Sequence, residues 1–70
     1  MTLGQYLKQV RLDLNASLAD VRRDTGISDA YLCNVEKGVY TPGLRNMVQL
    51  CDYYGISLNE VAEFVREKHG

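Results

Sequence analysis

Three segments of this chain begin with the same helix-start signal, a Ser or Thr followed three residues later by Gln, Asp or Glu. The pairs are Thr2 with Gln5, Ser17 with Asp20, and Ser57 with Glu60. In such a capping box the hydroxyl accepts from a first-turn N–H, and the longer side chain accepts from the N–H of the cap residue. Apolar residues at helical spacing follow each pair, and no segment alternates with period two. We therefore predict an all-α domain.

Helix stop signals divide the chain further. Asn15, Gly26, Gly38 and Gly55 each follow an apolar run, where a residue that tolerates positive φ can end a helix. Pro42 stands where a fourth helix opens, at or near its first position, because its missing N–H costs nothing there. Five short helices are predicted, over residues 3–14, 17–26, 28–37, 42–55 and 57–69.

The length of 70 residues allows a single domain, residues 1–70, and excludes an enzyme with separate cofactor and substrate lobes. With 46% hydrophobic and 24% charged residues, a folded globule is expected rather than a disordered tail. No apolar run approaches the ~20 residues of a membrane span, and no signal segment opens the chain. We expect a cytoplasmic protein with no membrane partner. The net charge of −1 gives no overall sign of a nucleic-acid partner.

Side chains that could bind a metal or perform catalysis are few. Cys33 and Cys51 are far apart in sequence and His69 is the one histidine, which fits neither a zinc spacing nor a disulfide framework. Reduced thiols are the default without a secretory signal, with a Cys33–Cys51 bridge as the alternative. No Ser/His/Asp constellation and no glycine-rich phosphate loop is present. We expect no catalysis, no metal, no cofactor and no small-molecule substrate.

Residues 17–37 hold the most informative pattern, two short helices joined by a tight turn that contains Gly26. This is the plan of a helix-turn-helix motif. On a helical wheel whose inner side is centred on Leu32, that side of the later helix also carries Ser28, Val35 and Glu36. Its outer side carries Ala30, Cys33, Asn34 and Lys37. Small and hydrogen-bonding side chains suit entry into a major groove ~12 Å wide. On an isolated helix, however, such a polar side is more often ordinary solvent-exposed surface.

Matching residues at fixed gaps extend this pattern over most of the chain. They are Leu7, Arg11, Ser17, Leu18, Val21, 25–28, Tyr31, Leu32, 35–38, Thr41, Pro42, Leu50, 54–58 and Val61. With them, residues 3–64 resemble the helix-turn-helix domains of the Cro and lambda-repressor type, also called xenobiotic-response-element-like. Because several gaps are fixed at once, the signal is more specific than a motif of twenty residues. The resemblance implies a compact five-helix bundle whose second and third helices form the helix-turn-helix.

The resemblance also assigns contacts with double-stranded DNA. The base-reading positions fall on Asp29, Ala30 and Asn34. The Asn34 amide can bind adenine N6 and N7, and Ala30 can touch a thymine methyl. Asp29 can accept from cytosine N4, or its carboxylate can simply favour the positive end of the helix dipole; both interpretations stay open. Residues expected at the sugar-phosphate backbone are Ser17, Ser28, Tyr31, Lys37, Tyr40, Thr41 and Arg45.

Two structural roles follow from the same resemblance. Arg11 and Glu36 occupy the positions of an ion pair, which agrees with the inner place of Glu36, where an unpaired carboxylate would be costly. A monomer this small reads too few base pairs, so we expect a homodimer on a palindromic operator, with half-sites ~34–36 Å apart. The last helix is the expected dimer seam. Its Phe64 either lies in that interface or, alternatively, completes the core of its own chain. The seam residues are Val61, Phe64 and Val65.

Divided by segment, the net charge does not oppose a DNA partner. Residues 1–45 carry six basic and five acidic side chains, whereas residues 46–70 carry two and four. We therefore predict a sequence-specific transcriptional regulator, a repressor of a bacterium or phage. The alternative is a protein-interaction module on the same scaffold, an anti-repressor or adaptor. It is suggested by Asp29, by the overall acidity, and by Leu18, where the family commonly has a phosphate-binding Gln. Arg22 and Cys33 depart from the family pattern as well.

Overall fold

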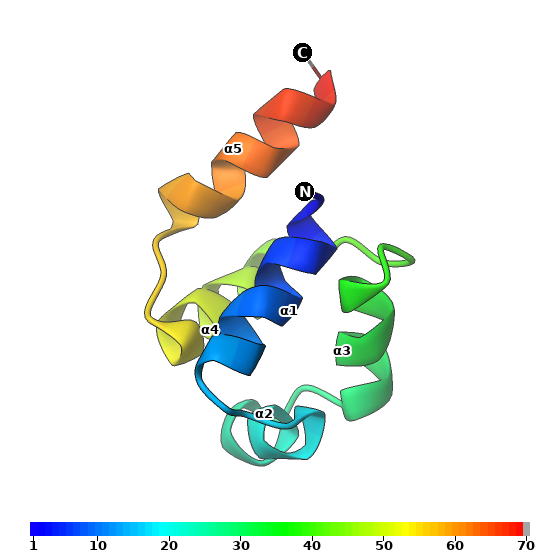
Figure 1. The fold of residues 1–70 in the computed structure, drawn as a ribbon, viewed down its shortest axis with the longest axis vertical. Helices are drawn as coiled ribbons and strands as arrows, with labels where there is room; N and C mark the ends of the chain where they lie inside the picture. Colours follow the sequence, from blue (N-terminus) through cyan, green and yellow to red (C-terminus); the bar gives the residue numbers. More distant parts are fainter. Residues whose placement is uncertain (70) are drawn as a thin grey trace.

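Five helices follow one another along the chain and meet around one core (Figure 1). They are α1 (Leu3–Asp13), α2 (Leu18–Thr25), α3 (Asp29–Glu36), α4 (Leu44–Tyr54) and α5 (Leu58–His69). This computed structural model describes the backbone of residues 1–69 and the side chains of residues 1–66. No strand occurs in residues 1–69, so the predicted all-α class with five helices is confirmed.

Local capping sets where the first two helices begin. At α1, Thr2 Oγ1 accepts from the Gln5 N–H at 3.1 Å, and Gln5 Oε1 accepts from the Thr2 N–H at 2.8 Å. At α2, Ser17 and Asp20 make the same reciprocal pair at 3.0 and 2.9 Å. The Ser17 N–H holds the pKa of the Asp20 carboxyl below its usual range. Both predicted capping boxes are therefore complete.

The third predicted box, at α5, is used differently. Ser57 Oγ accepts from the Glu60 N–H at 3.3 Å, as predicted. The Glu60 carboxylate, however, accepts from the hydroxyl of Tyr6 on α1 at 2.7 Å. A residue distant in sequence has taken the acceptor that local reasoning assigned to the cap, because folding brings α1 beside α5.

The predicted helix stops adopt left-handed backbone. Asn15 has φ 56°, and the C-caps Gly26 and Gly55 have φ 79° and 71°. The start of α4 differs from the prediction, because Pro42 does not open the helix. Gly43 is the N-cap of α4, which leaves the buried Pro42 in the preceding loop. A proline one residue before the cap still suits extended backbone, so it fixes the entry into the helix rather than its first turn.

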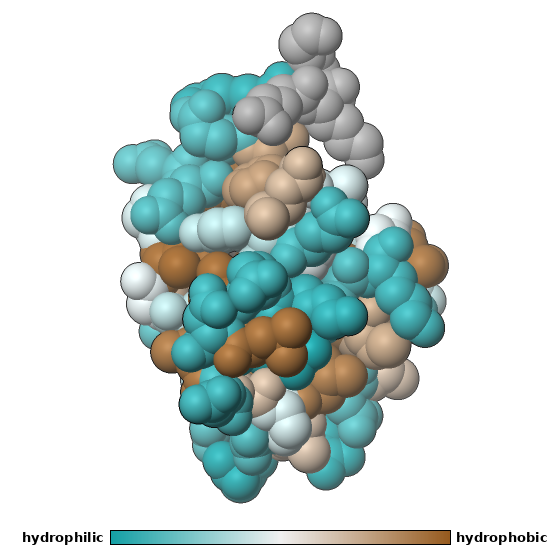
Figure 2. All heavy atoms as spheres, viewed as in Figure 1, coloured by the Kyte–Doolittle hydropathy of each residue, from teal (hydrophilic) through white to brown (hydrophobic). Residues whose placement is uncertain are grey.

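The core lies where α1, α3 and α4 converge with α2. Its buried apolar residues are Leu7, Val21, Ile27, Leu32, Val35, Met47, Leu50, Cys51, Tyr54 and Val61. Both cysteines are free thiols, so the alternative disulfide is absent, and burial raises the pKa of the Cys51 thiol. In Figure 1, α5 projects beyond the other four helices. Figure 2 shows mostly polar side chains on one face, with smaller apolar areas between them.

Gly4 sets how closely α1 approaches α3. A Cβ at this position would lie 2.5 Å from the Val35 carbonyl oxygen and 2.6 Å from that of Glu36. Both atoms belong to backbone, so neither can move aside cheaply. The glycine is required here for close contact, and it lets the end of α3 rest directly on α1.

No helix in residues 1–69 is both long and apolar enough to cross a bilayer. Among the described side chains, no three His, Cys, Asp or Glu residues gather closely enough to hold a metal ion.

Candidate nucleic-acid interface

The turn between α2 and α3 is held by short polar contacts around an apolar plug. The Thr25 hydroxyl donates to the Val21 carbonyl at 2.7 Å and accepts from the Ile27 N–H at 3.2 Å. Ile27 is buried directly after the left-handed Gly26. These contacts fix the angle between the two helices, as a helix-turn-helix requires.

The helix α3 buries one side and presents the other. Leu32 and Val35 are each only 2% exposed and anchor the inner side. Residues predicted to face outward are exposed or half-buried: Ala30, Cys33, Asn34 and Lys37. In Figure 1, α3 forms one edge of the molecule, with its outer side uncovered by other helices. This edge is the candidate reading surface.

Ser28 is a correction to the helical wheel, which placed it on the inner side. It is exposed, because it is the N-cap of α3 and has extended backbone (φ −63°, ψ 146°) rather than helical geometry. Its Oγ accepts from the Tyr31 N–H at 3.1 Å. Ser17 makes the same kind of bond at the start of α2. In each case the hydroxyl proton stays available to donate to a phosphate oxygen.

Asp29 is engaged locally. Its Oδ2 lies 3.6 Å from Arg22 Nη1 of α2, and its Oδ1 accepts from the Ala30 N–H at 3.0 Å. Both charged side chains of this pair are about half exposed, so the pair is worth little energetically. The exposed Arg22 side chain extends outward from α2 to meet α3. These contacts give the acid a local partner, and base reading by Asp29 stays a prediction.

The loop after α3 carries Tyr40 and Thr41, two of the residues predicted to contact the sugar-phosphate backbone of DNA. The Asn34 carbonyl accepts from the N–H groups of Val39 at 2.9 Å and Tyr40 at 3.4 Å, which folds the loop back against α3. The Tyr40 ring stacks on that of Tyr31, with 5.6 Å between centroids. Tyr40 and Thr41 are both exposed. The loop therefore holds the Tyr40 ring beside α3.

A polar groove of about 450 Å³ lies between the helix-turn-helix and the start of α4. Its polar lining includes Ser28, Tyr31, Arg45, Asn46 and Gln49. Sequence reasoning found the first three and missed Asn46 and Gln49. Their signal was present, since both lie opposite the apolar stripe of α4, but only the fold shows that this side meets α3. Exposed Lys37 lies at the other end of α3.

The Arg11–Glu36 pair joins α1 to the end of α3. Nε of Arg11 donates to Glu36 Oε2 at 2.8 Å and Nη2 donates to Oε1 at 2.9 Å, a bidentate geometry. Nη1 donates to the Ala16 carbonyl at 2.9 Å. The two side chains are 10% and 7% exposed. Hydrogen bonding to Glu36 raises the pKa of Arg11, so the guanidinium stays charged and holds the end of α3 to α1.

The predicted seam residues on α5 have different environments. Val61 is 4% exposed and belongs to the core of its own chain, and its part in a dimer seam stays a prediction. The Phe64 ring stacks on Tyr6 with 4.9 Å between centroids, so it packs against its own α1. Val65 is 44% exposed. Phe64 and Val65 are the seam residues that this arrangement leaves at or near the surface.

The anchored α3, the tight turn and the polar edge together define a helix-turn-helix domain. The chain belongs to that family: the family model described as "helix-turn-helix domain" matches residues 2–64. The chain is also similar to the "HTH-type transcriptional regulator DdrOP3" of Deinococcus deserti, with 31% identity over 65 residues. That match covers 93% of this chain and 50% of the relative, so the chain spans about half of the relative's length. No solved structure matches the chain significantly.

Proposed function

We propose that this chain is a sequence-specific DNA-binding transcriptional regulator of the Cro and lambda-repressor type, and that it acts as a repressor in the cytoplasm of a bacterium or in phage infection. The observation that carries the proposal is the presentation of α3. Leu32 and Val35 anchor the helix, while its opposite side lies free at the edge of the molecule. The second helix of a helix-turn-helix reads base edges in the major groove. A relative named as a transcriptional regulator adds support.

Base reading is assigned to the outer side of α3. Asn34 is the principal reader, because an Asn amide pairs bidentately with adenine and discriminates by ~1–3 kcal/mol. Ala30 is exposed one turn earlier, where its methyl can contact a thymine methyl. Asp29 takes part through cytosine, with Arg22 reducing its repulsion from nearby phosphates.

Phosphate binding is assigned to groups that surround α3. Ser28 and the exposed Lys37 are donors at the two ends of α3, and the Ser17 hydroxyl is a donor at the start of α2. The polar groove between α3 and α4 suits one phosphate, with Arg45 supplying the charge. Asn46 and Gln49 add amide donors to the same groove. Tyr31, Tyr40 and Thr41 complete the hydroxyl set.

The proposed active form is a homodimer on a palindromic operator. Each α3 would then read one half-site, with centres ~34–36 Å apart. The seam uses the end of α5, where Val65 is exposed and Phe64 is half-buried. Two subunits also double the number of phosphates neutralised, which a chain of net charge −1 needs for useful affinity.

Binding to random duplex DNA at several salt concentrations tests the proposal. The logarithm of the binding constant should fall linearly with the logarithm of salt concentration, because phosphate contacts release counterions. Lys37→Ala and Arg45→Ala should each flatten this slope by about one unit. Lys8→Ala, which removes an exposed cation from α1, is the matched control and should leave the slope unchanged. Affinity that ignores salt, or no binding at low salt, overturns the proposal.

A selection of bound duplexes from a random pool then tests base reading. The wild-type chain should enrich a palindromic site, and Asn34→Ala should relax discrimination at one base pair of each half-site. Asn59→Ala removes an exposed amide from α5 and should change nothing. Weakening of all sequences equally by Asn34→Ala would contradict its assignment as a base reader.

The second candidate function is a protein-interaction module without DNA contact. Leu18 favours it, because this side chain at the start of α2 packs against the core and offers no donor to a phosphate. A chain that folds normally but shows no salt-dependent DNA binding would support this second candidate.

A further inference from the structure

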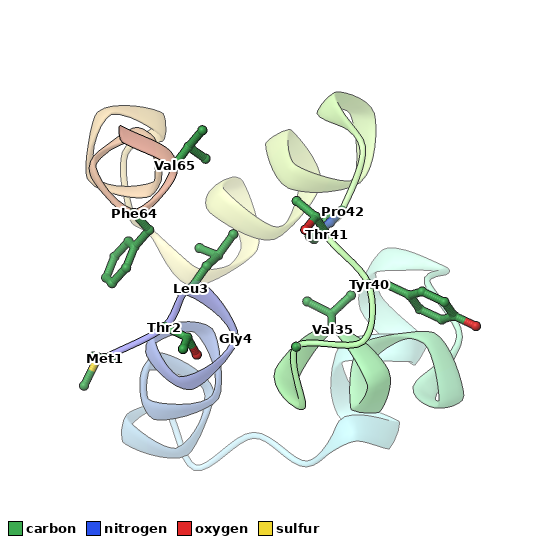
Figure 3. Close-up of a pocket in the computed structure, with 11 residues that line it drawn as sticks. Met1, Thr2, Leu3, Gly4, Val35, Tyr40, Thr41, Pro42, Phe64 and Val65 are labelled. Carbon is green, nitrogen blue, oxygen red and sulfur yellow. The ribbon is translucent and has the colours of Figure 1, made fainter. Parts of the chain in front are cut away.

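An apolar groove of about 550 Å³ opens between the start of α1, the loop after α3, and α5. Figure 3 shows Leu3 lying between Phe64 and Val65 on one side and Thr41 and Pro42 on the other. None of the described residues that line this groove has a charged side chain, so the groove offers no guanidinium or carboxylate to a base edge. The charged groups that can add to base reading lie elsewhere, at the start of α3.

Arg22 of α2 and Asp29 of α3 face each other beside the candidate reading surface. Arg22 Nη1 lies 3.6 Å from Asp29 Oδ2, and the two side chains are 55% and 47% exposed. This separation is longer than a hydrogen bond, so the two charges attract each other without occupying the guanidinium donors or the lone pairs of Oδ2. Asp29 Oδ1 accepts from the Ala30 N–H at 3.0 Å, which holds the carboxylate at the first turn of α3. The pair therefore presents donors and an acceptor side by side.

The neighbouring Arg23 is arranged differently, although it lies on the same helix. Its Nε donates to Asp24 Oδ1 at 3.2 Å, and its Nη1 donates to Asp20 Oδ1 at 3.3 Å. Both of these carboxylates belong to α2 itself. Arg22 instead reaches across the turn to the first residue of α3. Of these two adjacent arginines, Arg22 is the one whose guanidinium lies beside the helix proposed to read bases.

The major-groove edge of a G·C base pair matches this order of groups. Guanine presents two acceptors, N7 and O6, and cytosine presents one donor, the N4 amino group. O6 and N4 are hydrogen-bonded to each other and therefore lie ~2.9 Å apart. This spacing is close to the 3.6 Å between Arg22 Nη1 and Asp29 Oδ2. A guanidinium can donate bidentately to N7 and O6 while the carboxylate next to it accepts from N4.

We propose that Arg22 and Asp29 together read one G·C base pair in each half-site, with Arg22 donating to guanine N7 and O6 and Asp29 accepting from cytosine N4. This inference rests on the proposed function and adds to it a base reader on α2. The other base pairs fit less well. An A·T pair sets its adenine amino group against the guanidinium, a reversed pair sets guanine O6 against the carboxylate, and a T·A pair offers the guanidinium one acceptor in place of two.

The place of this base pair in the half-site follows from the geometry of α3. Asn34, the proposed reader of adenine, lies ~7.5 Å beyond Asp29 along the helix axis, because an α-helix rises by about 1.5 Å per residue. Base pairs follow one another at about 3.4 Å along the duplex. The G·C pair should therefore lie within about three base pairs of the position that Asn34→Ala relaxes.

Selection of bound duplexes from a random pool tests the inference on the full chain. Arg22→Ala should lose between about fivefold and a hundredfold of the discrimination at the G·C pair and keep the other preferences. Arg22→Lys keeps the charge but not the bidentate fork, so it should lose most of the same discrimination. Arg23→Ala is the matched control and should select the wild-type site. Because the ion pair of Arg22 is half exposed, Arg22→Ala should keep the melting temperature of the wild type.

A modified base then tests the contact atom by atom. In 7-deazaguanine a C–H group replaces N7, which removes one acceptor and leaves base pairing intact. In the selected duplex, this base at the G·C pair should weaken binding of the wild-type chain by about threefold or more. The same base should leave binding of Arg22→Ala unchanged, because the donor that used N7 is already absent.

A selected site without this G·C pair, or an Arg22→Ala variant that keeps the preference for it, overturns the inference. If Arg22→Ala flattens the salt slope by about one unit and weakens all sequences equally, Arg22 binds a phosphate and is not a base reader. Each of these results leaves the proposed regulator standing. A wild-type chain without salt-dependent binding to duplex DNA overturns the regulator itself, and the reading of a G·C pair with it.

Discussion

The helix α1 contacts α3 and α5 in two different ways. Against α3 it presents Gly4 and Arg11, and the contact is nearly free of water, with the Arg11 and Glu36 side chains 10% and 7% exposed. Against α5 it presents Tyr6, whose hydroxyl donates to Glu60 at the surface and whose ring stacks on Phe64. One helix thus makes a contact shielded from solvent on one side, here called the dry junction, and a solvent-exposed contact on the other.

This difference separates the two proposed tasks of the domain. A buried bidentate pair is strongly destabilising to break, because removing one partner leaves an uncompensated charge. An exposed hydrogen bond is worth about 0.5–1.5 kcal/mol. The helix α3, which we propose reads DNA, is therefore fixed to the body of the protein. The helix α5, which carries the proposed seam, meets α1 through contacts that can open locally at small cost.

Arg11→Ala should have the largest effect, because it strands the Glu36 carboxylate at the dry junction. We expect a loss of about 3–5 kcal/mol in the free energy of unfolding, measured by urea denaturation. The paired variant Arg11→Met with Glu36→Leu should recover most of this loss, because no charge remains buried. A single variant with unchanged stability would show that the junction is not dry.

Gly4→Ala should come next, at about 2 kcal/mol, because its Cβ would press on two backbone carbonyls of α3. Gly43→Ala is the matched control: its Cβ would meet nothing within 4 Å, and its φ of −67° is ordinary for alanine. The control should change stability by less than about 1 kcal/mol. Equal effects of the two variants in urea denaturation would contradict the close approach of α1 and α3.

Tyr6→Phe should cost only about 1 kcal/mol, because it removes a surface hydrogen bond and keeps the ring on Phe64. Its effect should be local. Amide hydrogen exchange should quicken in the backbone of residues 58–66 of α5, while the amides of α3 keep their protection. Quickening in both helices would mean that α5 does not open independently.

Tyr54→Phe should leave the free energy of unfolding unchanged at neutral pH and alter it only in alkali. Burial, together with the nearby Glu36 charge, raises the pKa of Tyr54 from 10.0 to about 12. The folded state therefore favours the neutral phenol. This contribution is fully present below pH 10 and is lost as pH rises toward 12. The stability of the wild-type chain should fall more steeply than that of Tyr54→Phe over this range, as measured by denaturation at each pH. Parallel curves would show that Tyr54 is not buried.

Much of the fold could be predicted from short-range signals. The capping boxes at Thr2 and Ser17 and the left-handed Asn15 were readable because a cap needs only residues within one turn. The pairing of Arg11 with Glu36 came from a family resemblance instead. Nothing local joins two residues on different helices.

Other features were not predictable because they depend on more than short-range sequence signals. Ser28 was placed on the inner side because a helical wheel ignores that a cap residue lies outside the helix. The burial of Val61 in the core of its own chain likewise depends on how α5 lies against the other helices. For the candidate site, the outer residues of α3 were predictable, whereas Asn46 and Gln49 were not. Their relevance depends on how α4 lies against the turn.

Caps, stops and apolar spacing act over a few residues, so the five short helices and the helix-turn-helix among them were predictable from the chain alone. Three features depend instead on how the helices pack. They are the hydrogen bond from Tyr6 to Glu60, the close approach of the α3 carbonyl groups to Gly4, and the position of the apolar groove. Those choices depend on crossing distances between helices, which no local pattern encodes.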